Sequence, residues 1–142
     1  MPQASHTASF KLSLVVVVFS IVLQTDTCAA ANHKAVKKGA WGGDHIAIEV
    51  SEKGAEVEFD CAHGQVTQPI KLDKHGRFKV SGTFTAEHGG PVRRDEAPES
   101  SPVSYSGHVK GDTMSLTITR GDEKLGDYRL TRGGNPRLMK CR

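Results

Sequence analysis

Hydrophobic and polar side chains alternate along the chain from residue 46 onward, in short segments separated by turn residues. In the first of these segments, 46–50, Ile46, Ile48 and Val50 share one face. The alternation recurs in seven later segments: 55–61, 66–72, 77–86, 103–109, 114–118, 128–130 and 137–141. A period of two is typical of a strand with one buried face, and no segment after residue 32 shows the 3.6-residue period of a helix. The pattern predicts an all-β fold.

Turn sequences separate the segments: EKGA at 52–55, DKHG at 73–76, KGDT at 110–113 and GGNP at 133–136. Short strands with turn signals at roughly 8- to 12-residue spacing are typical of antiparallel barrels and sandwiches. We expect an up-and-down meander of about eight strands closed as a small barrel, because closure removes exposed strand edges. A β-sandwich is the alternative.

The first 31 residues have a different pattern. A polar start that carries Lys11 leads into LSLVVVVFSIVL at 12–23, and small residues follow. Twelve helical residues span roughly 18 Å, which is less than a bilayer core of about 30 Å. We therefore predict that residues 1–31 are a signal peptide, cleaved after Ala30 or Ala31, and that the protein is exported to the periplasm or secreted. An uncleaved anchor and lipidation at Cys28 are the alternatives.

Cleavage would leave two cysteines, Cys61 and Cys141, which are separated by 80 positions. An even number of cysteines in an oxidising compartment indicates a disulfide, so we predict one between these two residues.

The long polar connection 87–101 and several unusual side chains follow strands that end on the same side of the predicted meander. Successive connections alternate between the two ends, so Cys61, Cys141, His45, His63 and His88 should share one end. Binding residues concentrate on loops held by a rigid scaffold, and barrel mouths are favoured pockets. We expect a small apolar ligand or another exported protein to bind there. The candidate binding residues are Trp41, His45, His63, His88, Arg93, Arg94 and Tyr105.

Metal binding and catalysis are further hypotheses for the same end. His63 and His88 share the inward phase of their strands, so they are candidate ligands for zinc or copper, although their spacing matches no known metal signature. The alternative is that both hydrogen-bond loop backbone. The disulfide accounts for Cys61, and no G-x-S-x-G sequence is present, so we do not expect an enzyme or a cofactor. A metal-dependent enzyme at these histidines, and an inhibitor or envelope interaction protein acting through residues 87–101, remain open.

Charge adds little to these predictions. Lys11 and Asp26 are the only charged residues in the first 31, so residues 32–142 contain 18 Lys and Arg against 15 Asp and Glu. This small surplus is scattered, which excludes a nucleic-acid partner. Its one cluster, Lys34, Lys37 and Lys38, lies in a basic leader, 32–41, that we place before a barrel domain at 42–142. Membrane contact is expected only through the signal peptide before cleavage.

Five short stretches carry a resemblance to known proteins: WGGDHI at 41–46, FDCAHG at 59–64, EHGGPVR at 87–93, YSG at 105–107 and KC at 140–141. In these stretches the chain resembles a family of short exported bacterial proteins. The resemblance implies a domain that starts near residue 41 and no particular activity. In fold the chain is also similar to lipocalin-like barrels and to small periplasmic lysozyme inhibitors, an analogy that rests on no shared motif.

Overall fold

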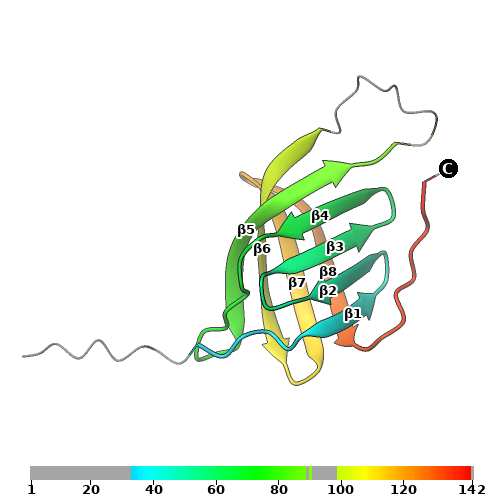
Figure 1. The fold of residues 1–142 in the computed structure, drawn as a ribbon. Helices are drawn as coiled ribbons and strands as arrows, with labels where there is room; N and C mark the ends of the chain where they lie inside the picture. Colours follow the sequence, from blue (N-terminus) through cyan, green and yellow to red (C-terminus); the bar gives the residue numbers. More distant parts are fainter. Residues whose placement is uncertain (1–32, 89, 91–98, 142) are drawn as a thin grey trace, which may run out of the picture. The chain divides into compact units, whose positions relative to one another are not determined.

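The computed structural model describes residues 33–88, 90 and 99–141. In these residues eight antiparallel strands form a closed barrel, in which each strand pairs with the next and β8 pairs with β1 (Figure 1). The strands are β1 (Gly39–Gly43), β2 (Ile46–Val50), β3 (Ala55–Phe59), β4 (Ala62–Val66), β5 (Arg77–Ala86), β6 (Ser100–Lys110), β7 (Thr113–Arg120) and β8 (Glu123–Arg132). Across these described ranges no helix is long and apolar enough to cross a membrane. The predicted all-β barrel is confirmed.

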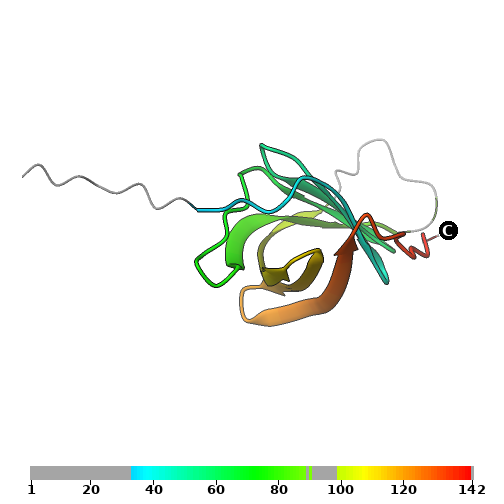
Figure 2. The same ribbon diagram turned by 90° about the horizontal axis from the view of Figure 1, so that it is seen from below.

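The alternation of side chains produces the two faces of the barrel wall. In β3, Ala55, Val57 and Phe59 are buried, whereas Glu56 and Glu58 are exposed. The same alternation buries one face of β2 and of β7. The longer strands β5–β8 curve round and close against the shorter strands β1–β4 (Figure 2). One apolar interior therefore forms inside a wall that is polar outside.

Three strands differ from the prediction, the first, the last and the expected third, although the number of strands is eight in both. The sequence of β1, GAWGG, has three glycines and one large side chain, so no alternation marks it. The predicted last strand, 137–141, is not a strand, because only Arg137 forms an isolated bridge there, with Asp44. The barrel therefore begins at Gly39, inside the segment 32–41 that the pattern assigned to a leader.

The residues before β1 also belong to the fold. Ala35 forms an antiparallel bridge with Lys71. The Val36 N–H donates to the Ile70 carbonyl (3.0 Å), and the Leu72 N–H donates to the Lys34 carbonyl (2.7 Å). Since Val36, Ile70 and Leu72 are buried, this short pairing closes one end of the barrel. The expected third strand, 66–72, is therefore wrong: β4 covers Ala62–Val66 instead, and residues 70–72 pair with the N-terminal segment.

Side chains fill the interior of the barrel. The largest fully buried ones are Trp41, Ile46, Tyr105, Met114, Ile118 and Leu130. The cavity among Ile48, Val57, Tyr105 and their neighbours has a volume of about 10 Å³. That volume is about one water-sized probe, so this interior cavity has no room for a small organic ligand.

Aromatic rings occupy the space beside the glycines that face inward. A Cβ at Gly82 would lie 2.8 Å from Cε2 of Tyr105, and a Cβ at Gly64 would collide with the Tyr105 hydroxyl. Phe78 lies in the same way against Gly107, where a Cβ would be 2.8 Å from its Cζ. These glycines therefore admit large rings instead of leaving the barrel hollow.

The predicted disulfide between Cys61 and Cys141 is present. Its Cα atoms are 5.2 Å apart, which is within the usual range for such bonds. The bond joins the turn between β3 and β4 to the C-terminal tail, which consists of residues 133–141. A disulfide of this kind is compatible with an oxidising environment outside the cytoplasm.

Removing this disulfide should lower the stability of the barrel substantially. The bond closes a loop across a sequence separation of 80 residues. A loop of that length restricts the unfolded chain enough to contribute about 4–5 kcal/mol. We predict that the Cys61→Ser, Cys141→Ser double variant loses free energy of unfolding on this scale in urea titrations. Wild type in reductant should match the variant, and equal stability of oxidised and reduced wild type would contradict the prediction.

Candidate functional site

The connections β1–β2, β3–β4, β5–β6 and β7–β8 lie at one end of the barrel, which we call the histidine rim. His45, the Cys61–Cys141 disulfide and His88 lie in or beside these connections, and His63 is the second residue of β4. The opposite end carries the tight turns that the sequence indicated. The strand order therefore brings the three histidines and Cys61 to the same end, and the C-terminal tail brings Cys141 there.

His45 is held in an unusual backbone conformation by contacts on both sides. It lies in the β1–β2 turn with φ 65°, a region that residues other than glycine adopt uncommonly. Its N–H donates to the Arg137 carbonyl (2.9 Å), and its Nδ1 lies 2.6 Å from Oδ2 of Asp60. The imidazole is therefore fixed through Nδ1, and its side chain remains 54% exposed.

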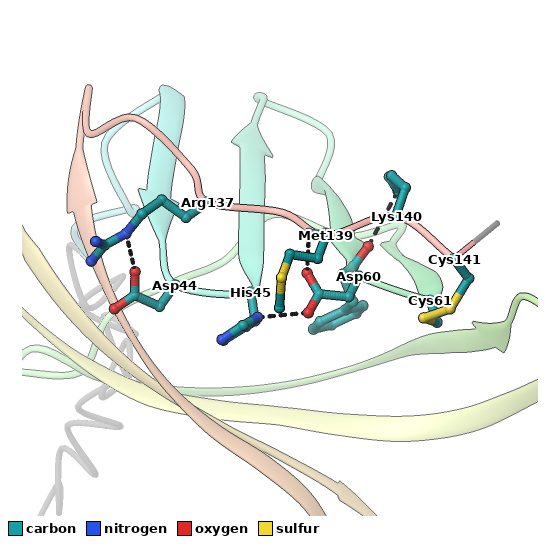
Figure 3. Close-up of polar contacts among 9 residues, drawn as sticks. Asp44, His45, Asp60, Cys61, Arg137, Met139, Lys140 and Cys141 are labelled. Atoms are coloured by element: carbon teal, nitrogen blue, oxygen red, sulfur yellow. Dashed lines mark hydrogen bonds and ion pairs between the residues drawn. A yellow bond between two sulfur atoms is a disulfide. The ribbon is translucent and has the colours of Figure 1, made fainter.

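Asp60 links three parts of the rim. Besides His45, its carboxylate accepts a hydrogen bond from the Met139 N–H (2.8 Å) through Oδ1 (Figure 3). Its backbone carbonyl accepts the Cys141 N–H (3.3 Å). The hydrogen bond from Met139, together with the contact to His45, holds the pKa of the Asp60 carboxyl below its ordinary value of 3.8. A charged Asp60 thus ties the β1–β2 turn to the C-terminal tail.

His63 forms a second pair with a carboxylate. Its Nδ1 lies 2.7 Å from Oε1 of Glu87, which follows β5, and its side chain is 51% exposed. The sequence placed His63 in the inward phase, and that is wrong. In β4 the even-numbered residues Ala62, Gly64 and Val66 are buried instead, because the Asp60–Cys61 turn reverses the phase between β3 and β4. The ring therefore lies on the outer wall.

Among the described residues, the remaining candidates for the rim do not form a cluster with His45 and His63. His88 is exposed and follows the end of β5, so it does not continue the inward phase of that strand either. Arg93 and Arg94 lie outside the described residues. Nothing in the described structure therefore brings His88 together with His63 as a pair of ligands.

Trp41 and Tyr105 are interior residues, so their expected place at the rim is wrong. Trp41 lies in the middle of β1, is 1% exposed and donates from Nε1 to the Lys37 carbonyl (3.0 Å). Tyr105 is 2% exposed and donates from its hydroxyl to the Thr83 carbonyl (2.6 Å). Burial raises the pKa of the Tyr105 phenol. Both rings pack in the core, and their polar atoms are satisfied by backbone carbonyls.

The C-terminal tail forms one side of the rim, which the sequence analysis did not foresee. It runs past the β1–β2 and β3–β4 turns (Figure 1) and is held by the Asp44–Arg137 ion pair (2.5 Å) and the disulfide (Figure 3). It crosses Gly42, where a Cβ would collide with the Gly134 carbonyl. The double glycine in β1 was the available signal, since it permits this close approach of two backbones.

In each histidine–carboxylate pair, the residues that the structure describes provide a hydrogen-bond partner for Nδ1 and none for Nε2. When Nδ1–H donates to a carboxylate, Nε2 is an acceptor that can bind a hydrogen-bond donor or a metal ion. In the described part of the chain, no three His, Cys, Asp or Glu side chains are grouped to hold a metal. Within the same residues, no hydroxyl or thiol is hydrogen-bonded to either imidazole. Over the described ranges, the rim thus presents two oriented imidazoles with no nucleophile hydrogen-bonded to either.

The contact between Asp60 and Met139 of the tail should weaken in acid, because the charged carboxylate accepts the Met139 N–H more strongly than the protonated one does. A carboxyl whose pKa is lowered by folding stabilises the native contact above its unfolded pKa and loses that effect as the pH falls through its folded pKa. We predict that the Met139 amide proton shift changes in NMR spectra with a midpoint below 3.8. The Asp60→Asn variant should lack this step, and Asp122→Asn, at the same rim, should retain it. A midpoint at or above 3.8 would contradict the account.

Comparison with known proteins identifies no relative of this chain. No protein-family model matches it, no curated protein matches it, and no solved structure matches it. Its function is therefore argued from the geometry of the rim.

Proposed function

We propose that this protein is an exported binding module that docks onto another exported protein through the histidine rim. The observation that carries the proposal is the pair of outward imidazoles, His45 and His63. Each is fixed through Nδ1 by a carboxylate from a neighbouring turn, and about half of each side chain is exposed. Fixed, exposed aromatic groups with a free polar atom are well suited to an interface, because little side-chain entropy is lost when a partner binds.

The filled interior favours a surface for recognition over an internal pocket. The cavity inside the barrel has a volume of about 10 Å³, whereas pockets that enclose small ligands measure about 300–1,000 Å³. A small apolar ligand would therefore have to bind outside the barrel. A macromolecular partner fits the exposed rim better than such a ligand does.

The tail supports the proposal because it makes the rim rigid. Three contacts hold the tail against the β1–β2 and β3–β4 turns of the rim. They are the disulfide, the Asp44–Arg137 ion pair and the hydrogen bond from Met139 to Asp60. Loops that are fixed before binding lose less conformational entropy when a partner docks, as in other preorganised binders. We also propose, from the sequence, that residues 1–31 direct export, which would deliver the domain to an oxidising compartment.

A metal ion is the second candidate ligand, because a histidine that binds a metal usually donates its other ring N–H to an acceptor such as a carboxylate. His45–Asp60 and His63–Glu87 both have this arrangement. A third ligand would then have to come from the partner, since the described residues supply no group of three. Titration of the isolated protein with zinc, followed at the imidazole protons by NMR, separates this candidate from direct docking.

Photo-crosslinking in cells that export the chain tests the docking proposal. We place p-benzoylphenylalanine in place of His88, at the histidine rim, and separately in place of His75, which is exposed at the opposite end. The proposal predicts that a single exported protein is crosslinked from position 88 and not from position 75. Equal adducts from both positions, or none from position 88, would contradict it.

Affinity measurements with the crosslinked partner then test the histidines themselves. His63→Ala should weaken the complex at least about fivefold, which corresponds to an interface residue worth about 1 kcal/mol. Glu87→Gln keeps the ring but removes the charged group that orients it, so its effect should be smaller. His75→Ala is the matched control and should bind like wild type. An inhibitor that acts through residues 87–101 alone would tolerate His63→Ala, and that result would overturn the role of the histidine.

A further inference from the structure

The end of the barrel opposite to the histidine rim contains a large cleft that the sequence analysis did not anticipate. This end, the lysine rim, is formed by the connections β2–β3, β4–β5 and β6–β7 together with the segment 33–38. The cleft has a volume of about 860 Å³ and is lined by residues 33–35 and 37, 72–77, 109 and 111. Its size lies within the range of sites that bind small organic molecules.

Backbone pairing builds the cleft from segments that are distant in the sequence. Residues 34–36 pair with residues 70–72, and these two segments form one wall. The tight turn 73–76 forms another wall, and it is fixed to β6 because the Val109 N–H donates to the Gly76 carbonyl (2.8 Å). Leu72, which is buried, and Val109 add apolar surface between the walls.

Positive charge dominates the lining of the cleft. Four cationic side chains, Lys34, Lys37, Lys74 and Arg77, face one carboxylate, Asp73. A smaller cleft of about 360 Å³ shares Asp73 and Arg77 with the first and adds Lys71 and Lys79. A concave site lined by one sign of charge concentrates ligands of the opposite sign.

The Asp73 carboxylate is engaged within its own turn. Its Oδ1 accepts hydrogen bonds from the His75 and Arg77 N–H groups (2.8 Å each), and its Oδ2 accepts one from Nε of Arg77 (3.1 Å). The hydrogen bond from the Arg77 backbone, followed by the contacts with His75 and the Arg77 side chain, lowers the pKa of Asp73. The carboxylate therefore orients Arg77 and stays ionised while it does so.

Several donors in the cleft are left for a ligand. Only Nε of Arg77 contacts Asp73, so neither terminal guanidinium nitrogen has a protein acceptor among the residues that the structure describes. In the same residues, Lys34 and Lys74 form no ion pair, whereas Lys37 pairs with Asp112 (2.7 Å) outside the cleft lining. A fork-shaped guanidinium that lines the same cleft as two ammonium groups is well suited to phosphate oxygens.

We propose that this basic cleft binds a phosphorylated anion with at least two negative charges, through Lys34, Lys74 and the free end of Arg77. The ligand could be a soluble phosphate ester or the headgroup of an anionic phospholipid, since both present the same oxygens. The site is independent of the histidine rim, because it lies at the other end of the barrel and shares no residue with it.

Titration with inorganic pyrophosphate tests the proposal. The protein is produced by export of the full chain, so that its disulfide forms. Amide resonances of residues 33–37 and 72–77 should shift to saturation in NMR spectra. The affinity should fall when the salt concentration rises from about 0.05 to 0.5 M. The Lys34→Gln, Lys74→Gln double variant should bind at least about tenfold more weakly, because two charge-assisted contacts are lost.

Matched variants separate a built site from a general attraction to positive charge. Lys53→Gln, Lys124→Gln removes the same charge from exposed positions outside the cleft and should bind like wild type. Arg77→Lys keeps the charge but loses the fork, and should bind more weakly than wild type. Thermal unfolding checks that each variant is folded. Equal binding by the two double variants would overturn the proposal. The absence of binding both to pyrophosphate and to vesicles that contain phosphatidylglycerol would overturn it as well.

Vesicles identify the source of the phosphate. Sedimentation with phosphatidylcholine vesicles, with and without phosphatidylglycerol, is compared with the pyrophosphate titration. Binding of pyrophosphate without binding to vesicles would support a soluble ligand. Binding to phosphatidylglycerol that requires Lys34 and Lys74 would support a lipid headgroup. His63→Ala should change neither result, so failure at this cleft and failure of the histidine-rim proposal can be told apart.

Discussion

The closure of the barrel between β1 and β8 is the interaction on which the rest of the structure depends. This pairing is short, since it joins only Trp41–Gly43 to Leu130–Arg132. Trp41 anchors the seam from within, because its buried ring belongs to β1. On the outside, the tail crosses Gly42, pairs with the residues that follow β1 and is fixed by the disulfide. Few ladder pairs therefore suffice. The packing of Trp41 supports the seam from inside, and the tail, which the disulfide fixes to the β3–β4 turn, supports it from outside.

Closure also separates two ends with different chemistry. At one end, turns and tail assemble two histidine–carboxylate pairs around the disulfide. At the other, the pairing of residues 34–36 with 70–72 forms one wall of a cleft whose charged side chains are mainly cationic. Side chains fill the interior between the two ends, so the small cavity there does not connect either end to a pocket of ligand size. A small barrel of this kind can present two independent surfaces on a single rigid support.

Much of the fold followed from local patterns, because burial on one face of a strand leaves a period of two in the sequence. That pattern located β2, β3, β5, β6 and β7. It also predicted that Cys61 and Cys141 share one end, although Cys141 reaches that end through the tail and not as the end of an eighth strand. It missed β1, whose glycines are required by the passage of the tail and leave no alternation. It also misread the tail as a strand, since residues 137–141 alternate in sequence but pair through Arg137 alone.

The details of the two surfaces could not be read from the sequence, because they depend on non-local contacts. A two-residue turn at Asp60 and Cys61 reverses the phase of His63, and no periodicity extends through such a turn. Trp41 looked like a rim residue because the strand around it was not visible. Lys34 and Lys74 are forty positions apart, and the backbone pairing of residues 34–36 with 70–72 brings their segments together.

Native-state hydrogen exchange in the oxidised and reduced protein tests the central role of the seam most directly. If the tail and disulfide hold β1 against β8, reduction should accelerate exchange at Trp41–Gly43 and Leu130–Arg132 more than in the β5–β7 ladders, which have longer pairings. Equal acceleration throughout the barrel, or unchanged exchange at the seam, would contradict the account.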